Sequence, residues 1–261
     1  MNAISINNLT KSFGGLVAVD ALSLDIPAGI TTGLIGPNGS GKTTLMNLLT
    51  GTLVPDCGEI SFPSLEGCHE VAGRVTPLGR KAATPPRGRI FPTDLRKLKI
   101  ARTFQDGRLI NQMSVRDNLL LAIAKPDTIG AITEFNTYDE RVESVLRKIH
   151  LFEHADKNAE ELSYGQRKLL ELGRAIITDA DIYLLDEPFT GLFPKVIEHV
   201  IELLNELKNS GKTLIIIEHN IGLIRKLCNN VIVLDHGQLL ADGTPEQVLK
   251  NTKVQQAYLG V

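Results

Sequence analysis

The sequence is poor in cysteine and has no apolar stretch long enough to cross a bilayer. Its three cysteines, Cys57, Cys68 and Cys228, are an odd number without CxxC spacing or a histidine-rich neighbourhood. This argues against a disulfide framework and against a zinc site, and predicts reduced thiols. No apolar run approaches the roughly 18 residues that a spanning helix needs. The start, MNAISINNLTKSF, lacks the basic and apolar regions of a signal peptide, so a cytosolic chain is expected.

A large net charge is also lacking. The 261 residues include 28 basic and 30 acidic side chains. No global positive field therefore draws the chain to nucleic acid or acidic lipid, and no nucleic-acid partner is expected. The local exception runs from Arg74 to Arg102, where nine basic residues accompany one acid, Asp94. Because charge runs are usually solvated, a solvated insertion is favoured there over a lipid- or RNA-binding arm.

Apolar periodicity and turn residues predict a coarse order of elements. Alternation from Ala3 to Pro27 predicts short strands, and the prolines in and around 64–92 predict a loop. Residues 114–175 contain amphipathic stretches typical of helices. After Asp181 strands and helices alternate, which implies a parallel sheet covered by helices. The fold class is therefore α/β.

A glycine-rich segment between a predicted strand at 30–35 and a predicted helix at 43–50 carries the clearest chemical signal. GPNGSGKTT fits G-x-x-x-x-G-K-[ST], whose glycines let backbone N–H groups turn inward around phosphate oxygens. Lys42 is expected to bridge the β- and γ-phosphates, and Thr43 to offer its hydroxyl to Mg²⁺. A plain glycine-rich turn is the alternative, but the flanking elements favour ATP binding. The expected nucleotide-binding residues are Gly36, Pro37, Asn38, Gly39, Ser40, Gly41, Lys42, Thr43 and Thr44.

Two adjacent carboxylates follow the strand predicted at IYLL. Asp186 and Glu187 come at its carboxyl end, the edge where open α/β sheets bind ligands. Behind a phosphate-binding loop, Asp186 suits the Mg²⁺ shell and Glu187 the attacking water, although paired acids after a strand are also common on surfaces. His219 emerges from the strand of TLIIIEHN. It is either a structural histidine or one that contacts the γ-phosphate and positions water.

The segment LSYGQ opens another predicted helix. Ser163 and Gln166 have the spacing of a capping box, so the segment can be read simply as a well-capped helix. It can equally be a second anion site, with Ser163 and the N–H of Gly165 at the helix N-terminus facing a phosphate. Spacing alone does not separate these alternatives.

The motifs occur in an order that resembles the ATPases of ATP-binding cassette (ABC) transporters. GPNGSGKTT, Gln105 in ARTFQ, LSYGQ, IYLLDEP and the His219 loop follow one another across almost the whole chain. The resemblance implies a P-loop NTPase (RecA-like) core with an antiparallel β-subdomain, spanning 1–105 and 176–261, and an inserted α-helical subdomain at 106–175. It also implies that ATP lies between the phosphate loop of one subunit and the signature LSYGQ of another.

The same resemblance implies roles for individual residues. Lys42, Gln105, Glu187 and His219 are expected to be catalytic, and Thr43, Gln105 and Asp186 to hold Mg²⁺. Phe13 is expected to stack on adenine, with core packing as the alternative. Ser163, Gly165 and Gln166 are expected to contact the nucleotide of a second ATPase subunit, identical or related.

The implied partners are transmembrane permease subunits, contacted near Gln105, and indirectly a substrate-binding protein. The implied location is the cytoplasmic face of the cell membrane, peripheral to it. FGGLVAVD, IEHN and the tail DGTPEQVLKN resemble most the ATPases of branched-chain amino acid importers, while urea-importer and lipopolysaccharide-exporter ATPases share several of these features. A non-transport ABC protein is a rival, which one uninterrupted motif set disfavours. Two departures are Tyr164, where the family has Gly, and Phe193, where many relatives have Asp.

Overall fold

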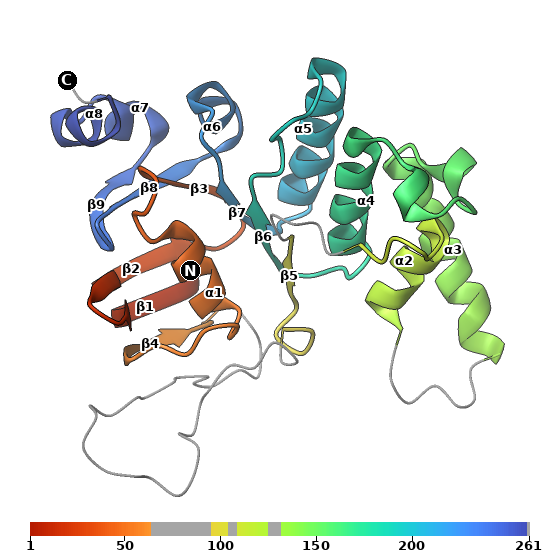
Figure 1. The fold of residues 1–261 in the computed structure, drawn as a ribbon, viewed down its shortest axis with the longest axis horizontal. Coiled ribbons are helices and arrows are strands. Elements are labelled where there is room, and N and C mark those ends of the chain that lie inside the picture. Colours follow the sequence, from red (N-terminus) through yellow and green to blue (C-terminus); the bar gives the residue numbers. More distant parts are fainter. Residues whose placement is uncertain (64–94, 104–108, 125–131, 260–261) are drawn as a thin grey trace, which may run out of the picture.

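The computed structural model describes residues 1–63, 95–103, 109–124 and 132–259 of the chain. The loop expected at 64–92 and Gln105 lie outside these residues. Among the described helices, none is long and apolar enough to cross a bilayer. Figure 1 shows strands gathered at one end of the molecule and in its middle, with a group of helices at the other end.

The smaller sheet is antiparallel and is built from the N-terminal part of the chain. Its strands β1 (Asn2–Phe13), β2 (Leu16–Pro27) and β4 (Cys57–Ser61) lie in the order β2-β1-β4. The predicted strands are therefore confirmed, but they form one long hairpin instead of short pieces, turning at Gly14 with φ 60°. Apolar side chains on one face alternate into the core, because successive strand residues point to opposite faces.

The larger sheet has the order β5-β6-β7-β3-β8-β9. The strands from β5 to β8 run parallel, as the sequence predicted for the three strands after Asp181; β5 was not predicted. Their bounds are β3 (Thr31–Ile35), β5 (Ile100–Arg102), β6 (Ile182–Asp186), β7 (Thr213–Ile217) and β8 (Asn230–Asp235).

The sixth strand, β9 (Gln238–Gly243), was not predicted from the sequence, and it pairs antiparallel with β8. The reason lies in the turn His236-Gly237, where φ is 45° and 79°. Two successive residues with positive φ form the tight turn that joins antiparallel strands. The sheet is therefore mixed at this edge.

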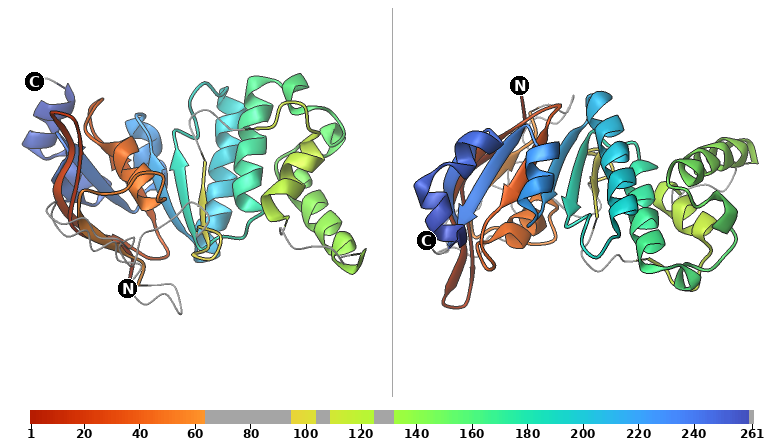
Figure 2. Two further views of the ribbon diagram at one scale, coloured as in Figure 1. Left: turned by 60° about the horizontal axis from the view of Figure 1, so that its bottom comes forward. Right: turned by 90° about the horizontal axis from the view of Figure 1, so that it is seen from above.

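Helices cover both faces of the larger sheet and form a separate group beyond β5. The core helices are α1 (Lys42–Leu49), α5 (Pro194–Asn209), α6 (Ile221–Leu227), α7 (Pro245–Leu249) and α8 (Thr252–Leu259). The group beyond β5 has α2 (Val115–Ile123), α3 (Ile132–Lys148) and α4 (Tyr164–Ile176), with short 3-10 turns at Phe152–His154 and Ala159–Glu161. Both views of Figure 2 place this group on the far side of the large sheet from the small one.

Two apolar clusters hold the layers together, one on each face of the large sheet. In β6, Ile182 and Leu184 pack into the cluster shared with the small sheet and α1, whereas Tyr183 and Leu185 pack into the cluster shared with α4 and α5. Burial of each such side chain contributes about 1.5–3 kcal/mol. Because both faces are packed, the carboxyl ends of these strands are held in a fixed relation to one another.

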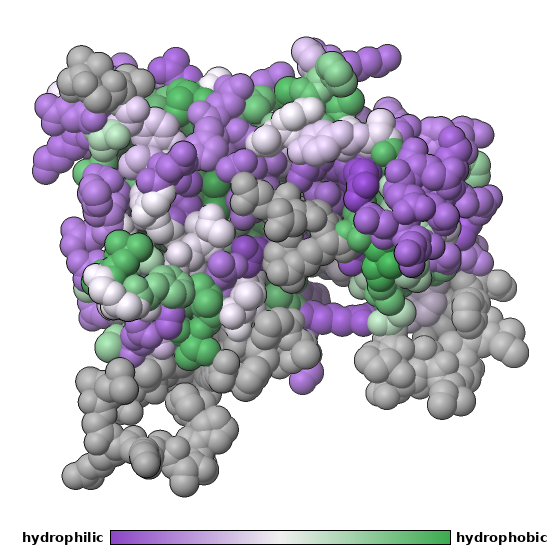
Figure 3. All heavy atoms as spheres, in the orientation of Figure 1, coloured by the Kyte–Doolittle hydropathy of each residue, from purple (hydrophilic) through white to green (hydrophobic). Residues whose placement is uncertain are grey.

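Figure 3 shows the surface of the molecule in the orientation of Figure 1. Hydrophobic residues gather over the small sheet, whereas the helices beyond β5 present mostly hydrophilic residues. Exposed hydrophobic side chains of the small sheet include Phe13, Leu16 and Val17 at the end of the hairpin.

Candidate functional site

Strand register brings the motif residues to one edge of the large sheet. β7 lies between β6 and β3, with Ile217 opposite Asp186 on one side and opposite Leu34 on the other. The residues that follow these strands are therefore neighbours at the carboxyl edge, where open α/β sheets bind ligands. The phosphate loop follows β3, the carboxylates follow β6, and His219 follows β7.

The phosphate loop takes a backbone path that only glycine can follow at two points. Gly36 and Gly41 have φ of 153° and 100°. A Cβ on Gly36 would lie 2.1 Å from the carbonyl oxygen of Leu234, and one on Gly41 would lie 2.3 Å from that of Ala18. Gly39 also has positive φ, 79°, but faces open space. The loop is thus packed tightly at its ends and open at its tip, as a cradle for a phosphate chain requires.

Lys42 begins α1 and folds back over the loop. Its Nζ donates to the carbonyl oxygens of Gly36 (2.8 Å) and Pro37 (3.0 Å). Burial lowers the pKa of its ammonium, and the charges of Glu187 and Asp186 oppose that effect. The cation and the two carboxylates are therefore electrostatic neighbours, as the sequence predicted.

Asp186 ends β6 in a buried position. Its backbone N–H donates to Thr103 Oγ1 (3.1 Å), and its Oδ2 lies 3.9 Å from Nη2 of Arg102. Burial raises the pKa of its carboxyl, while the positive charge of Arg102 opposes the rise. The side chain is held rigidly between β5 and β6, which suits a ligand that must keep one geometry.

Glu187 occupies a left-handed backbone conformation with φ 47°. Its N–H donates to the carbonyl oxygen of Ile217 (3.0 Å), which fixes it beside β7. A non-glycine residue at positive φ costs about 1–2 kcal/mol, and such strain persists only where surrounding contacts impose it. The carboxylate is thereby aimed away from the strand direction and toward His219.

Each oxygen of the Glu187 carboxylate contacts a different side chain. Its Oε1 lies 3.1 Å from Nε2 of His219, and its Oε2 accepts from Thr190 Oγ1 at 3.1 Å. His219 and Glu187 are therefore brought together, as expected of a group that polarises water and one that positions it.

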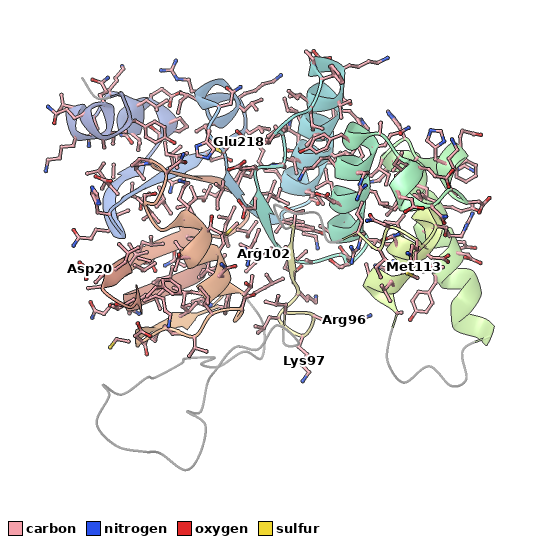
Figure 4. The ribbon with its side chains drawn as sticks, viewed as in Figure 1. Asp20, Arg96, Lys97, Arg102, Met113 and Glu218 are labelled. Atoms are coloured by element: carbon pink, nitrogen blue, oxygen red, sulfur yellow. The ribbon has the colours of Figure 1, made fainter. Side chains whose placement is uncertain are left out.

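The turn that presents His219 depends on a buried acid. Oε2 of Glu218 accepts from the N–H groups of His219 (2.8 Å) and Asn220 (3.1 Å), and Asn220 in turn caps α6. Figure 4 labels Glu218 at the end of β7 and Arg102 on β5, both in the middle of the molecule. His219 is thus fixed by its own loop and exposed toward solvent.

The signature helix α4 begins as a complete capping box. Ser163 N–H donates to Gln166 Oε1 (2.9 Å), and Gln166 N–H donates to Ser163 Oγ (3.4 Å). The capped-helix interpretation is therefore confirmed, and Gly165 lies in the first turn. In Figures 1 and 2, α4 and α1 lie on opposite sides of β6 and β7, so the signature does not adjoin the phosphate loop of its own chain.

Phe13 stands at the turn end of β1 and is 46% exposed, so it is not a core residue. Lys11 Nζ lies 5.6 Å from its ring centroid. The ring is available for stacking, and the core-packing alternative is wrong. Gln105 is not among the described residues, but Thr103, two residues before it, donates its N–H to the carbonyl oxygen of Leu184 (3.0 Å) at the same sheet edge.

Three functional neighbours were not predicted from the sequence: Arg102, Thr190 and Tyr258. Arg102 was counted with the solvated basic run, and this was wrong, because its side chain is 3% exposed; Arg96, Lys97 and Lys99 are exposed as expected. The signal available for Arg102 was its place between the apolar pair Ile100-Ala101 and the motif residue Gln105, since it ends β5. Tyr258, in α8, accepts from the N–H of Gly36 at 3.2 Å, a contact across 222 residues that no local pattern encodes.

The oxygen donors at this edge fit Mg²⁺. No group of three or more His, Cys, Asp or Glu side chains forms a metal cluster in the described part of the chain. Mg²⁺ is usually held by one or two carboxylates together with waters and substrate phosphates. The Asp186 carboxylate and the exposed hydroxyl of Thr43 are hard oxygen donors of this kind.

Comparison with protein families gives two matches. The family model described as ABC transporter matches residues 19–190, which include the phosphate loop, the signature and both carboxylates. A second model, described as branched-chain amino acid ATP-binding cassette transporter, matches residues 238–261, from β9 through α8.

Similar proteins match along nearly the whole chain. The high-affinity branched-chain amino acid transport ATP-binding protein LivG of Escherichia coli is 35% identical over 98% of this chain and 97% of its own length. BraF of Pseudomonas aeruginosa, with the same description, is 34% identical over the same shares. Among solved structures, the ADP conformation of MJ1267, an ATP-binding cassette of an ABC transporter, covers 100% of both chains at 31% identity with a TM-score of 0.78.

Proposed function

The chain belongs to the ABC transporter family and is an ATP-hydrolysing ATPase of that family, and from this premise we propose that it powers import of branched-chain or related amino acids. The observation that carries the catalytic part is the 3.1 Å contact between Glu187 and His219 beside the phosphate loop. The full-length similarity to LivG and BraF, and the family match at 238–261, support the cargo class. An ATPase of a urea importer or a lipopolysaccharide-type exporter is the alternative.

Binding of ATP begins at the phosphate loop. Backbone N–H groups from Gly39 to Thr44 and the N-terminus of α1 hold the phosphates, and Lys42 exchanges its contacts with the Gly36 and Pro37 carbonyls for phosphate oxygens. The exposed ring of Phe13 stacks on the adenine. Pro37, Asn38 and Ser40 shape the loop between the tightly packed glycines.

Hydrolysis depends on positioning and charge stabilisation, as is usual for phosphoryl transfer. Thr43, Asp186 and Gln105 would hold Mg²⁺, which would supply positive charge to the phosphates when bound. Glu187 takes up the developing proton of the attacking water, and His219 holds that water against the γ-phosphate. Lys42 neutralises charge on the departing diphosphate.

The catalytic site is completed by a second ATPase subunit. Ser163, Gly165 and Gln166 lie at the N-terminus of α4, on the far side of β6 and β7 from the phosphate loop of their own chain (Figure 1). Serving their own nucleotide would require α4 to cross the sheet. A second chain, identical or related, brings its signature to this chain's nucleotide, and closure of the pair accompanies ATP binding.

Transmembrane permease subunits anchor the protein at the cytoplasmic face of the membrane. A cavity of about 580 Å³ opens between β5 and the helices α2, α3 and α4, and Thr103 is among the residues that line it. Its walls include Arg96, Tyr138 and Arg141. This cavity offers the permease a contact that reaches both the sheet and the signature helix, and the substrate-binding protein meets the permease instead of this chain.

Glu187→Gln tests the catalytic assignment. The amide keeps the size of the side chain but cannot accept the water's proton, so turnover is expected to fall at least 100-fold while ATP binding is retained. The variant should accumulate as an ATP-bound dimer on size-exclusion chromatography. Wild-type turnover in this variant would contradict the role proposed for Glu187.

Transport of radiolabelled leucine and urea by the reconstituted complex tests the cargo.

A further inference from the structure

A chain of contacts connects the signature helix to the catalytic carboxylate within one subunit. We propose that Tyr164 is a positioning residue that couples the anion-binding end of α4, which serves the partner's nucleotide, to Glu187, which serves the chain's own nucleotide. The inference rests on the proposed function and adds to it a route for communication between two sites. Tyr164 is the first residue of α4, directly after Ser163.

The Tyr164 side chain lies against the loop that follows the carboxylates. Its hydroxyl donates to the carbonyl oxygen of Thr190 at 3.2 Å. Its ring covers Gly191, where a Cβ would lie only 2.8 Å from Cε1, and Gly191 has φ 73°. A side chain at 191 would therefore push the ring away, so glycine there permits the close contact. The first turn of α4 and the loop after β6 are joined by packing as well as by a hydrogen bond.

Thr190 continues the connection to the carboxylate. Its Oγ1 donates to Glu187 Oε2 at 3.1 Å, and the other oxygen of Glu187 lies 3.1 Å from His219 Nε2. Tyr164 therefore binds the backbone of Thr190, and the side chain of Thr190 binds the carboxylate of Glu187. A shift of the first turn of α4 therefore moves Thr190, and a shift of Thr190 changes the orientation of the carboxylate.

The backbone at Glu187 makes this orientation sensitive to its neighbours. With φ at 47°, the residue occupies a conformation that surrounding contacts must impose. Its N–H is fixed to Ile217, so the side chain is the part free to respond. Loss of the Thr190 contact removes one of the two groups that aim the carboxylate.

The contact does not serve the folding core. Tyr164 is 54% exposed, and Thr190 and Gly191 are exposed as well, whereas the buried side of α4 is formed by residues such as Leu170 and Leu172. Phe193, two residues beyond Gly191, is 79% exposed and has no polar side-chain atom to replace the Tyr164 contact. A hydrogen bond at the surface between two motif segments is thus explained by function better than by stability.

Tyr164→Phe removes only the hydroxyl and leaves the ring on Gly191. In the full-length protein, kcat is expected to fall about 5- to 10-fold, with KM for ATP changed less than 2-fold and the Hill coefficient for ATP reduced toward 1. Thr190→Val should have a similar effect, and the double variant should be no worse than the more impaired single variant, because both changes interrupt one connection.

Ser210→Ala is the matched control. Its hydroxyl also donates to a backbone carbonyl at the surface, that of Leu207 (2.8 Å), but at the far end of α5. This variant should keep wild-type kcat and Hill coefficient. Unfolding midpoints of all three single variants should agree with the wild type within a few degrees; equal kinetics in Tyr164→Phe and Ser210→Ala would overturn the inference.

Dimers assembled from two differently tagged variants test whether Tyr164 acts on Glu187 of its own chain or on the nucleotide of the partner chain. The reference is wild type paired with Glu187→Gln. When Tyr164→Phe is paired with Glu187→Gln, the only intact Glu187 belongs to the chain that lacks the Tyr164 hydroxyl. ATPase activity is therefore expected to fall about 5- to 10-fold below the reference. In a pair of wild type with the Tyr164→Phe, Glu187→Gln double variant, that reference activity should be retained. The reverse result assigns Tyr164 to the partner's nucleotide and overturns the proposal.

The pure Glu187→Gln pair distinguishes the two levels of failure. If it hydrolyses ATP at the wild-type rate, the proposed function of the site fails and the inference fails with it. If it is inactive and retains ATP, but Tyr164→Phe behaves as wild type, only the connection through Tyr164 is wrong.

Discussion

Arg102 and Asp186 form an ion pair in the interior of the protein, with Nη2 and Oδ2 3.9 Å apart and side chains 3% and 4% exposed. Nη1 of Arg102 also donates to Asn47 Oδ1 (2.8 Å) and Thr50 Oγ1 (2.9 Å) on and after α1. One guanidinium therefore ties the helix of the phosphate loop to the carboxylate that ends β6. Its planar fork of donors is suited to such a three-way contact.

Arg102→Met is expected to destabilise the protein by about 3–5 kcal/mol, because it leaves the Asp186 carboxylate buried without its cation. The pKa of Asp186, already raised by burial, should rise further. Urea unfolding measures the loss. The double variant Arg102→Met, Asp186→Asn is the control, since it removes both charges and should recover part of the stability; no recovery would mean that Arg102 acts mainly through Asn47 and Thr50.

Alanine substitutions in the phosphate loop should separate steric clash from backbone strain. Gly36→Ala and Gly41→Ala place a methyl group within 2.3 Å of a backbone oxygen, so we expect ATP binding to be lost. Gly39→Ala meets no atom within 4 Å, and its positive φ costs about 1–2 kcal/mol. Because the ligand-free loop already has this φ, ATP affinity should fall by at most roughly 5- to 30-fold. Titration with a fluorescent ATP analogue measures the series. Equal losses at all three positions would contradict this account.

Tyr258→Phe should weaken ATP binding although it lies 222 residues from the loop it supports. The hydroxyl accepts from the N–H of Gly36, and burial raises its pKa, so it stays protonated and neutral at physiological pH. Its loss removes a hydrogen bond of about 0.5–1.5 kcal/mol, or roughly 2- to 12-fold in affinity if the loop is less well ordered.

Gln256→Ala, on the exposed side of the same helix, is the control for Tyr258→Phe. Both variants should show the same α8 content by circular dichroism. Unchanged ATP affinity in Tyr258→Phe would show that the hydroxyl does not organise Gly36.

Asp56 should make the small sheet less stable in acid. The hydrogen bond from Lys11 Nζ (2.8 Å) lowers the pKa of the Asp56 carboxyl, assisted by the N–H of Ser12 (2.7 Å). A depressed pKa contributes stability that is present above the unfolded value, about 3.9, and lost as pH falls through the folded pKa.

Asp56→Asn is therefore expected to cost about 0.5–1.5 kcal/mol at pH 7, a modest amount because the pair is partly solvated. The difference from the wild type should shrink below about pH 4. Urea unfolding at pH 7 and pH 3 measures it, and Asp25→Asn, at an exposed position of β2, is the control. A constant difference across this range would count against the ion pair.

The functional motifs could be predicted from the sequence because each is local. Gly36 to Thr44 encodes its loop through glycine φ angles and a helix start, and Ser163 and Gln166 encode a capping box within four residues. Asp186 and Glu187 follow an apolar strand, which fixes the edge at which they emerge. The parallel strands β6, β7 and β8 were predictable for the same reason, since each is built on an apolar run, whereas the three-residue β5 was not predicted.

Other features depended on pairings between distant segments. The antiparallel β9 was missed because its side chains do not alternate, and only the turn at His236 and Gly237 directs it back along β8. Arg102 read as part of a basic run until strand pairing placed it beside Asp186. A sequence pattern depends on residues adjacent in the chain, whereas the burial of Arg102 depends on residues adjacent in space.

The sequence by itself determined the phosphate loop, the paired carboxylates and the capped signature, because dihedral preferences, strand periodicity and helix capping act over a few residues. Only the tertiary structure decided that Tyr164 meets Thr190 across 26 residues and that Tyr258 meets Gly36 across 222 residues. These contacts depend on how packed layers align the ends of separate strands and helices. That alignment is a property of the whole core.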